Sequence, residues 1–232
     1  MSDTVDAPGQ PEVRITAGSG SITVMGEARD DVVTDGHADV HRGHDGAIEI
    51  ASRRRSRSMT VRCPEGSSVM VGSRSGSLRL SGRLGAVRAT TMSGSIDVEE
   101  SKGADLRAMS GTITIGTCDG PCRIKTKSGS IRVGSADSVS VHIGSGRVTI
   151  DHVAGSVSVR AVSGSVTLEA GGGGPVEVET MSGSITVLLP SGCRPDVRAK
   201  SLSSRPKIEC ERGNDCSVAV RTLSGGITVR CR

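Results

Sequence analysis

Residues 93–98 read Ser-Gly-Ser-Ile-Asp-Val, and close copies of this stretch recur at 128–133, 163–168 and 182–187. Seven copies follow one another, with 17 to 19 residues between successive glycines, and two outlying copies lie nearer the ends of the chain. A short, fixed period predicts a solenoid, in which each repeat forms one coil stacked on the next. The glycines of the nine copies are Gly20, Gly76, Gly94, Gly111, Gly129, Gly146, Gly164, Gly183 and Gly225.

A second alternating segment lies between consecutive copies. Ile96–Val98 is followed by Leu106–Ala108, and Val166–Leu168 is followed by Val176–Val178. Each coil is therefore expected to hold two strands about nine residues apart, with apolar residues at i and i+2 pointing inward. A coil of three hexapeptides does not fit, because steps of six from Ile96 reach Lys102 and Thr114.

The nine glycines are predicted to be structural turn residues. Glycine adopts positive φ where a chain turns sharply, and a serine beside it can bond neighbouring backbone and form a ladder between coils. None of the copies resembles a nucleophile elbow, which requires a following helix. The run Gly171–Pro175 lacks the Lys-Ser/Thr ending of a phosphate-binding loop.

These patterns predict an all-β protein with a single β-solenoid (parallel β-helix) domain over residues 12–232, after a disordered N-terminal tail at 1–11. Gly20 and Gly76 are 56 residues apart, which corresponds to about three coils. Prolines at 190, 195 and 206 interrupt the alternation and predict an irregular excursion over about 190–216. The whole domain would contain about 12 coils of ~18 residues with two strands each, wound right-handed by the crossover rule.

The composition limits the classes of partner. The 232 residues include no Phe, Tyr or Trp, and the formal net charge is only +4. The basic run Arg53–Arg57 could contact phosphates, but no aromatic side chain is present to stack on a base, so no nucleic acid partner is expected. Met1–Val13 has no basic segment followed by an apolar run, and no stretch is apolar enough to span a membrane. The sequence therefore predicts a cytoplasmic protein.

The seven cysteines are odd in number and irregularly spaced, which favours reduced thiols over a disulfide framework. Cys63, Cys122 and Cys210 share the parity of inward-facing residues and are expected to fill core positions. Cys118 and Cys193 fall in expected turns and are the more reactive candidates.

One segment contains candidate metal ligands. If residues 38 and 40 point inward, His37, Asp39 and His41 share an outward face, and His44 follows in a turn. Same-face neighbours on a strand are about 7 Å apart, so His37 and His41 are too distant for one ion unless the strand bends. A solvated polar face is the main interpretation, with a metal site as an alternative. No cofactor is expected.

Several segments resemble a bacterial β-strand-repeat family of candidate adhesins, similar to the heads of autotransporter adhesins, whose molecular function is unassigned. The similar segments are the opening Gly18–Val24, the turn Val61–Gly66, the Ser-Gly series and the final Leu223–Val229, and the resemblance extends over about 11–231. It implies a β-solenoid and, for some relatives, a link to cell-envelope stress responses. It supplies no catalytic residues.

The outward-facing acids are scattered singly, without the clustered acids or bases that an enzyme's groove requires. The sequence therefore predicts a non-enzymatic β-solenoid scaffold or protein-interaction module, with its link to cell-envelope stress or adhesion implied by the resemblance. The identity of the protein partner is left open. The first alternative is a self-assembling, bactofilin-like rod joined end to end, because Ile227–Arg232 ends without a cap and only Arg230 and Arg232 would protect the edge. The second alternative is a metal-binding module that uses His37, His41 and His44.

Overall fold

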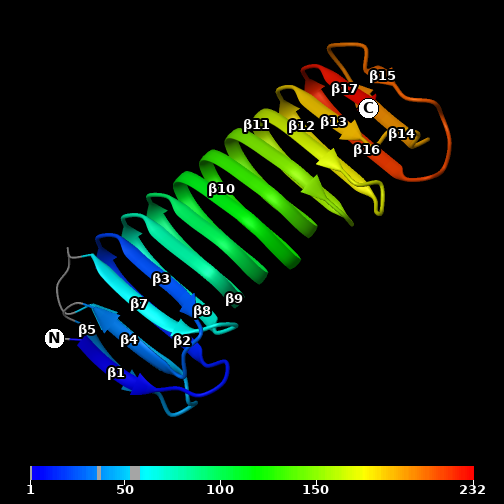
Figure 1. Ribbon diagram of the computed structural model, residues 1–232. Coiled ribbons are helices and arrows are strands. Elements are labelled where there is room, and N and C mark those ends of the chain that lie inside the picture. The colour runs from blue at the N-terminus through cyan, green and yellow to red at the C-terminus, as the bar shows by residue number, and fades with distance from the viewer. Residues whose placement is uncertain (1, 36–37, 53–57) are drawn as a thin grey trace. The chain divides into compact units, whose positions relative to one another are not determined.

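The computed structural model describes residues 2–35, 38–52 and 58–232 (Figure 1). These residues form an all-β protein, and none of them lies in a helix. The chain divides into two compact units, residues 1–119 and 120–232, which are described separately. The candidate ligand His37 and the basic run Arg53–Arg57 lie outside the described residues.

Unit 1 contains nine strands and the first part of a tenth. Its strands are β1 (Ser2–Asp6), β2 (Glu12–Ser19), β3 (Ile22–Glu27), β4 (Asp31–Asp35), β5 (Ala38–Arg42), β6 (Ile48–Ser52), β7 (Met59–Pro64), β8 (Ser68–Ser75), β9 (Leu78–Ser93) and the start of β10 (Ile96–Val153). Unit 2 contains the rest of β10, β11 (Val157–Ala170), β12 (Val176–Ser182), β13 (Ile185–Leu189), β14 (Asp196–Ser201), β15 (Lys207–Glu209), β16 (Ser217–Ser224) and β17 (Ile227–Cys231).

Most strands pair in parallel at the spacing of the sequence repeat. In unit 1, Val69 pairs with Val87 and Leu78 pairs with Ile96. In unit 2, the register joins Val139 to Val157 and Val157 to Val176. Equivalent residues therefore stack, and the inward aliphatic side chains form buried layers. Burying each such side chain contributes about 1.5–3 kcal/mol, so the repeated alternation supplies the core.

The Ser-Gly corners are held by glycine, and several of them also by a buried hydroxyl. Gly225 has a φ of 137°, and a Cβ built on it would overlap the carbonyl oxygen of Gly183 in the next coil. The serines connect neighbouring coils through their backbone carbonyls. The Ser93 carbonyl accepts hydrogen bonds from the Gly76 N–H at 3.1 Å and from Thr91 Oγ1 at 3.2 Å. The same threonine contact recurs at Thr126, Thr180 and Thr222. All nine Ser-Gly glycines have a positive φ between 108° and 137°.

The N-terminal coils of unit 1 are not stacked in chain order. β2 pairs with β8 on one side and with β6 on the other, and β3 lies likewise between β9 and β7. Gly20 therefore stacks directly on Gly76, and the prediction of about three successive coils between them is wrong. The intervening chain crosses to the outer side of β2 and β3, where it pairs with their other edges.

Residues 2–6 are also ordered, contrary to the prediction of a disordered tail. They form β1, which pairs antiparallel with β4, and β4 pairs antiparallel with β7. β4 would otherwise present unpaired backbone N–H and C=O groups along one edge. Because β1 satisfies these groups, the polar sequence of this segment does not prevent it from forming a strand.

The end of unit 2 has the same out-of-order arrangement. β16 lies between β12 and β14, and β17 lies between β13 and β15. The excursion over 190–216 thus contains two strands and supplies the outermost coil. The expectation that Ile227–Arg232 is an uncovered edge is wrong, because β17 is paired on both sides. The outer strand β14 carries exposed Arg198 and Lys200. Charged side chains on an edge strand discourage its pairing with another chain.

The corner geometry yields a test with an adjacent control. Gly225→Ala should lower the free energy of unfolding by about 1–3 kcal/mol, because the alanine would be strained at positive φ and would overlap Gly183. Gly226 has ordinary φ and no atom within 4 Å of a built Cβ, so Gly226→Ala should change it by less than about 0.5 kcal/mol. Urea denaturation followed by circular dichroism measures both, and equal effects would contradict the role of the corner.

Candidate functional site

The outer surface of unit 2 carries a row of charged side chains across four strands. The register joins Arg160 to Glu179, Glu179 to Arg221 and Arg221 to Lys200. The Glu179 carboxylate is shared, at 3.4 Å from Arg160 Nε and 3.7 Å from Arg221 Nη1. We call Arg160, Glu179, Arg221 and Lys200 the basic row. Glu177 also lies 3.9 Å from Arg160 Nη2, so two carboxylates accompany the three cations and one positive charge remains in excess.

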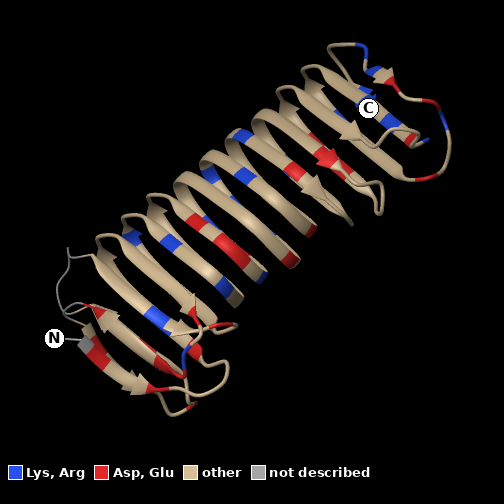
Figure 2. Ribbon diagram, in the orientation of Figure 1, with Lys and Arg blue, Asp and Glu red and all other residues tan. Residues whose placement is uncertain are grey.

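The basic row continues into β10. His142 pairs with Arg160 in the ladder. Partial burial lowers the pKa of His142, and the positive charges of Lys125 and Arg160 lower it further. The imidazole therefore reports a positive potential at this part of the surface. Elsewhere the charges of both signs are interspersed along the strands (Figure 2).

Next to the basic row lies a line of exposed apolar side chains. Each of its four residues follows a paired, more buried position: three lie at equivalent positions of β11, β12 and β16, and the fourth directly follows the last residue of β14. Their exposed fractions are 54% for Val162, 54% for Met181, 50% for Leu223 and 83% for Leu202. We call these four residues the apolar stripe. Single exposed apolar residues are common, but adjacent ones mark interaction surfaces.

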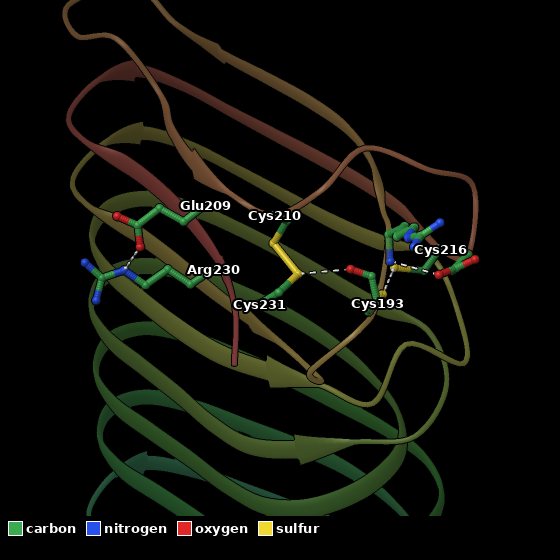
Figure 3. The surroundings of a disulfide bond; sticks show 8 residues. Cys193, Glu209, Cys210, Cys216, Arg230 and Cys231 are labelled. Carbon is green, nitrogen blue, oxygen red and sulfur yellow. Dashed lines mark hydrogen bonds and ion pairs between the residues drawn. A yellow bond between two sulfur atoms is a disulfide. The ribbon is translucent and has the colours of Figure 1, made fainter.

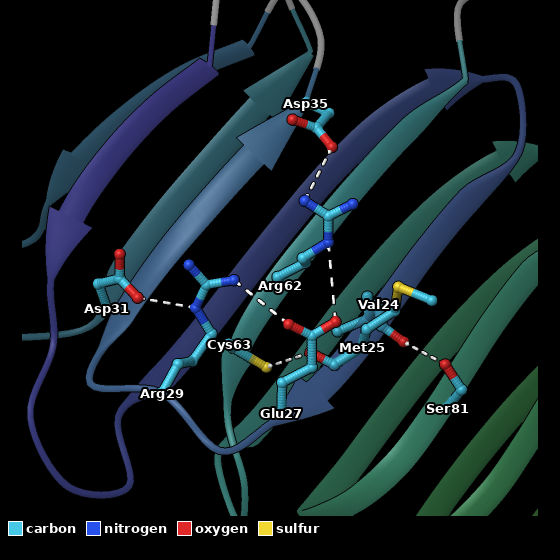
Figure 4. Close-up of polar contacts among 9 residues, drawn as sticks. All are labelled: Val24, Met25, Glu27, Arg29, Asp31, Asp35, Arg62, Cys63 and Ser81. Carbon is cyan, nitrogen blue, oxygen red and sulfur yellow. Dashed lines mark hydrogen bonds and ion pairs between the residues drawn. The ribbon is translucent and has the colours of Figure 1, made fainter.

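A second polar cluster ties the strands of unit 1 together (Figure 4). Arg29 Nε lies 2.7 Å from Asp31 Oδ1, and Arg62 lies between Glu27 at 3.7 Å and Asp35 at 3.3 Å. The hydrogen bond from Arg29 lowers the pKa of Asp31 and raises that of Arg29. Each of these carboxylates is paired with a cation, whereas a general acid needs a carboxyl group whose pKa is raised. The cluster therefore has the character of a structural tie.

The predicted metal ligands that the structure describes are not brought together. His41 Nε2 lies 3.0 Å from Glu49 Oε2, the cross-strand partner of His41, and His44 is exposed in the following turn. Asp45 instead contacts Arg14 at 2.6 Å. Among residues 2–35, 38–52 and 58–232, no group of three His, Cys, Asp or Glu side chains is placed to hold a metal ion. Asp39 is exposed on β5, and the structure does not support the metal-binding alternative.

The cysteines differ from the expectation of reduced thiols, since Cys210 and Cys231 form a disulfide (Figure 3). Cys118 is only 1% exposed in β10, so it is not an accessible turn thiol. Cys63 is buried as predicted, and burial raises its pKa to about 11. The sequence pattern could not reveal the disulfide, because its two residues meet only through the out-of-order coil.

The fold defines the protein as an all-β, β-solenoid-like repeat protein. The model of the Toastrack DUF4097 family matches residues 6–229, and the chain belongs to this family, whose function is unknown. No curated protein matches the sequence. None of the described residues forms a helix long and apolar enough to cross a membrane.

The chain is similar to several solved bacterial structures at low identity and with TM-scores below 0.5. A candidate adhesin from Bacteroides fragilis is 12% identical with a TM-score of 0.39, covering 98% of this chain and 96% of that one. A candidate adhesin from Parabacteroides merdae is 8% identical with a TM-score of 0.43, covering 100% and 95%. One from Parabacteroides distasonis is 12% identical with a TM-score of 0.43, covering 100% and 96%. At these values the similarities carry no argument about function.

The potential at the basic row can be measured through His142. Its pKa should lie below the ordinary 6.5, and Lys125→Gln should raise it by removing a neighbouring positive charge. Because the unfolded chain binds the proton more readily, His142 should reduce the free energy of unfolding as the pH falls through 6.5. Nuclear magnetic resonance titration measures the pKa directly. Lys207→Gln is the control, since Lys207 is paired with Glu209 at 2.7 Å, and an unchanged pKa in Lys125→Gln would contradict the assignment.

Proposed function

We propose that this protein is a non-enzymatic scaffold whose apolar stripe and basic row bind an acidic, amphipathic helix of a partner protein. The observation that carries this proposal is the adjacency of Val162, Met181 and Leu223 on three neighbouring strands and of Leu202 directly after the end of a fourth. All four are at least 50% exposed. A polar outer face would be expected if solvent were its only neighbour.

The spacing of the stripe favours a helix lying across the strands. Neighbouring strands are about 4.8 Å apart, so the four side chains span about 14 Å. One turn of an α-helix rises 5.4 Å, which places apolar residues of successive turns near successive side chains of the stripe. Half-exposed side chains of this size contribute on the order of 1 kcal/mol each when they are covered. Four such contacts are compatible with a modest, reversible affinity.

The charges favour an acidic partner. Arg160, Arg221 and Lys200 border the stripe, and the two carboxylates that contact the arginines, Glu177 and Glu179, leave one positive charge in excess. Carboxylates on one flank of the helix would pair with these cations as its apolar face covers the stripe. Complementary charge of this kind sets orientation and association rate more than affinity.

The Cys210–Cys231 disulfide supports an oxidising compartment rather than the cytoplasm, because disulfides persist mainly in such compartments. A role in adhesion or in the response to cell-envelope stress is compatible with that location and rests on the family resemblance. We also propose that the solenoid is right-handed, that it has about 12 coils, and that residues 12–232 form one continuous domain. Assembly through the final strand is not proposed, because β17 is paired on both sides.

Designed peptides test the proposed surface. A helical peptide of about 14 residues with leucines on one face and glutamates beside them should bind, and its lysine counterpart should bind much more weakly. Met181→Gln should weaken binding of the acidic peptide about tenfold, which corresponds to about 1.4 kcal/mol of lost contact. Fluorescence anisotropy measures both, and binding should also weaken as salt is added.

Met92→Gln is the matched control, because Met92 also precedes a Ser-Gly pair and is 52% exposed, but it lies in unit 1. It should leave binding unchanged. Equal binding of the two peptides, an equal loss in Met92→Gln, or binding to anionic lipid vesicles without binding to the peptide would each overturn the proposal.

A further inference from the structure

Four cysteines gather at the outer end of unit 2 (Figure 3). Cys210 and Cys231 are joined, whereas Cys193 Sγ and Cys216 Sγ lie 3.4 Å apart without a bond. Cys231 Sγ also lies 3.2 Å from the carbonyl oxygen of Cys193, so the two pairs are neighbours. A disulfide needs about 2.05 Å between the sulfurs. The second pair is therefore within a small side-chain movement of bonding.

The backbone on both sides of this pair is already held in place. The Arg194 N–H donates to Asp215 Oδ2 at 2.8 Å, and the Asp215 N–H donates to the Arg194 carbonyl at 3.0 Å. One residue further on, the Asp196 N–H donates to the Cys216 carbonyl at 2.8 Å. These contacts flank Cys193 and Cys216 and bring their side chains to the same place. Little ordering entropy remains to be lost when the bond forms.

The two thiols have different surroundings. Cys193 is partly exposed, whereas Cys216 is only 8% exposed. Burial raises the pKa of Cys216 to about 12, with further contributions from Cys193 and from the Asp215 carboxylate. Cys193 is thus the thiol that an external reagent reaches first, and Cys216 is placed to react with it second.

We propose that Cys193 and Cys216 form a second disulfide by exchange with a low-molecular-weight disulfide. The Cys193 thiolate attacks one sulfur of the reagent, whose S–S bond breaks, and a mixed disulfide forms as one thiol leaves. Cys216 then gives up its proton, and its sulfur attacks Cys193 Sγ and expels the second thiol. The two cysteines lose two electrons and two protons, and the reagent gains them as two thiols.

The new bond would close a loop over residues 193–216 that contains β14 and β15. It would join this loop to the start of β16, beside the existing bond to β17. Leu202 of the apolar stripe and Lys200 of the basic row lie inside the loop, so oxidation would hold them in place. This consequence rests on the proposed docking function, whereas the bond itself does not.

Treatment of the intact protein with oxidised glutathione tests the bond. Five cysteines lie outside the Cys210–Cys231 disulfide before treatment. After treatment, alkylation in denaturant should label three cysteines, two fewer than before. Peptide mapping should show Cys193 linked to Cys216. The Tm should rise by several degrees, because the loop is closed. Cys216→Ser should retain glutathione on Cys193 as the trapped mixed disulfide.

Cys63→Ala is the control variant, and it should form the second disulfide normally, because Cys63 is buried in unit 1. Alkylation of both Cys193 and Cys216 after treatment would overturn the proposal. So would linkage of Cys193 to Cys231, or one equivalent of zinc bound by the four cysteines. If the bond forms but the affinity for the acidic peptide stays the same in both redox states, only the consequence for docking fails.

Discussion

The close approach of successive coils at their glycine corners is the constraint on which the rest of the structure depends. At Gly164 and Gly183, the backbone of one coil lies where a Cβ of the next would have to be. Only glycine allows both this approach and the positive φ of the turn. Because the corner recurs at one place in each repeat, the strands that follow it remain in register. The inward aliphatic side chains then stack on their equivalents and exclude water.

The same regularity leaves the ends of each unit with strand edges to satisfy. Unit 1 and unit 2 meet this need in a similar way, by placing a chain segment outside the coil that the repeat pattern would put last. The outer segment of unit 2 is less buried, with Ile208 39% exposed, whereas the outer strands of unit 1 bury Ile48 and Val61 completely. In unit 2, the outer segment also brings together four cysteines that are far apart in the sequence.

The outward positions are much less constrained than the inward ones, so their side chains determine the polarity and charge of the surface. Where the residue before a Ser-Gly pair has a side chain, that side chain is exposed, so its identity does not affect the core. In unit 2 this position holds apolar residues on adjacent strands, beside a row with excess positive charge. The proposed docking surface and the proposed second disulfide meet in the segment between β13 and β16, which contributes Leu202 to one and Cys193 to the other.

Local sequence patterns were sufficient for the individual elements: alternation predicted the strands, parity predicted buried residues such as Cys63, and Ser-Gly spacing predicted where equivalent residues stack. They could not determine the order of the coils at the ends, because coils with the same alternation fit one another in several orders. The tertiary structure alone decided that Gly20 stacks on Gly76, that residues 2–6 form a strand, and that Cys210 meets Cys231. The physical reason is that edge pairing and coil order depend on which distant backbone groups remain unsatisfied, and no local pattern records this.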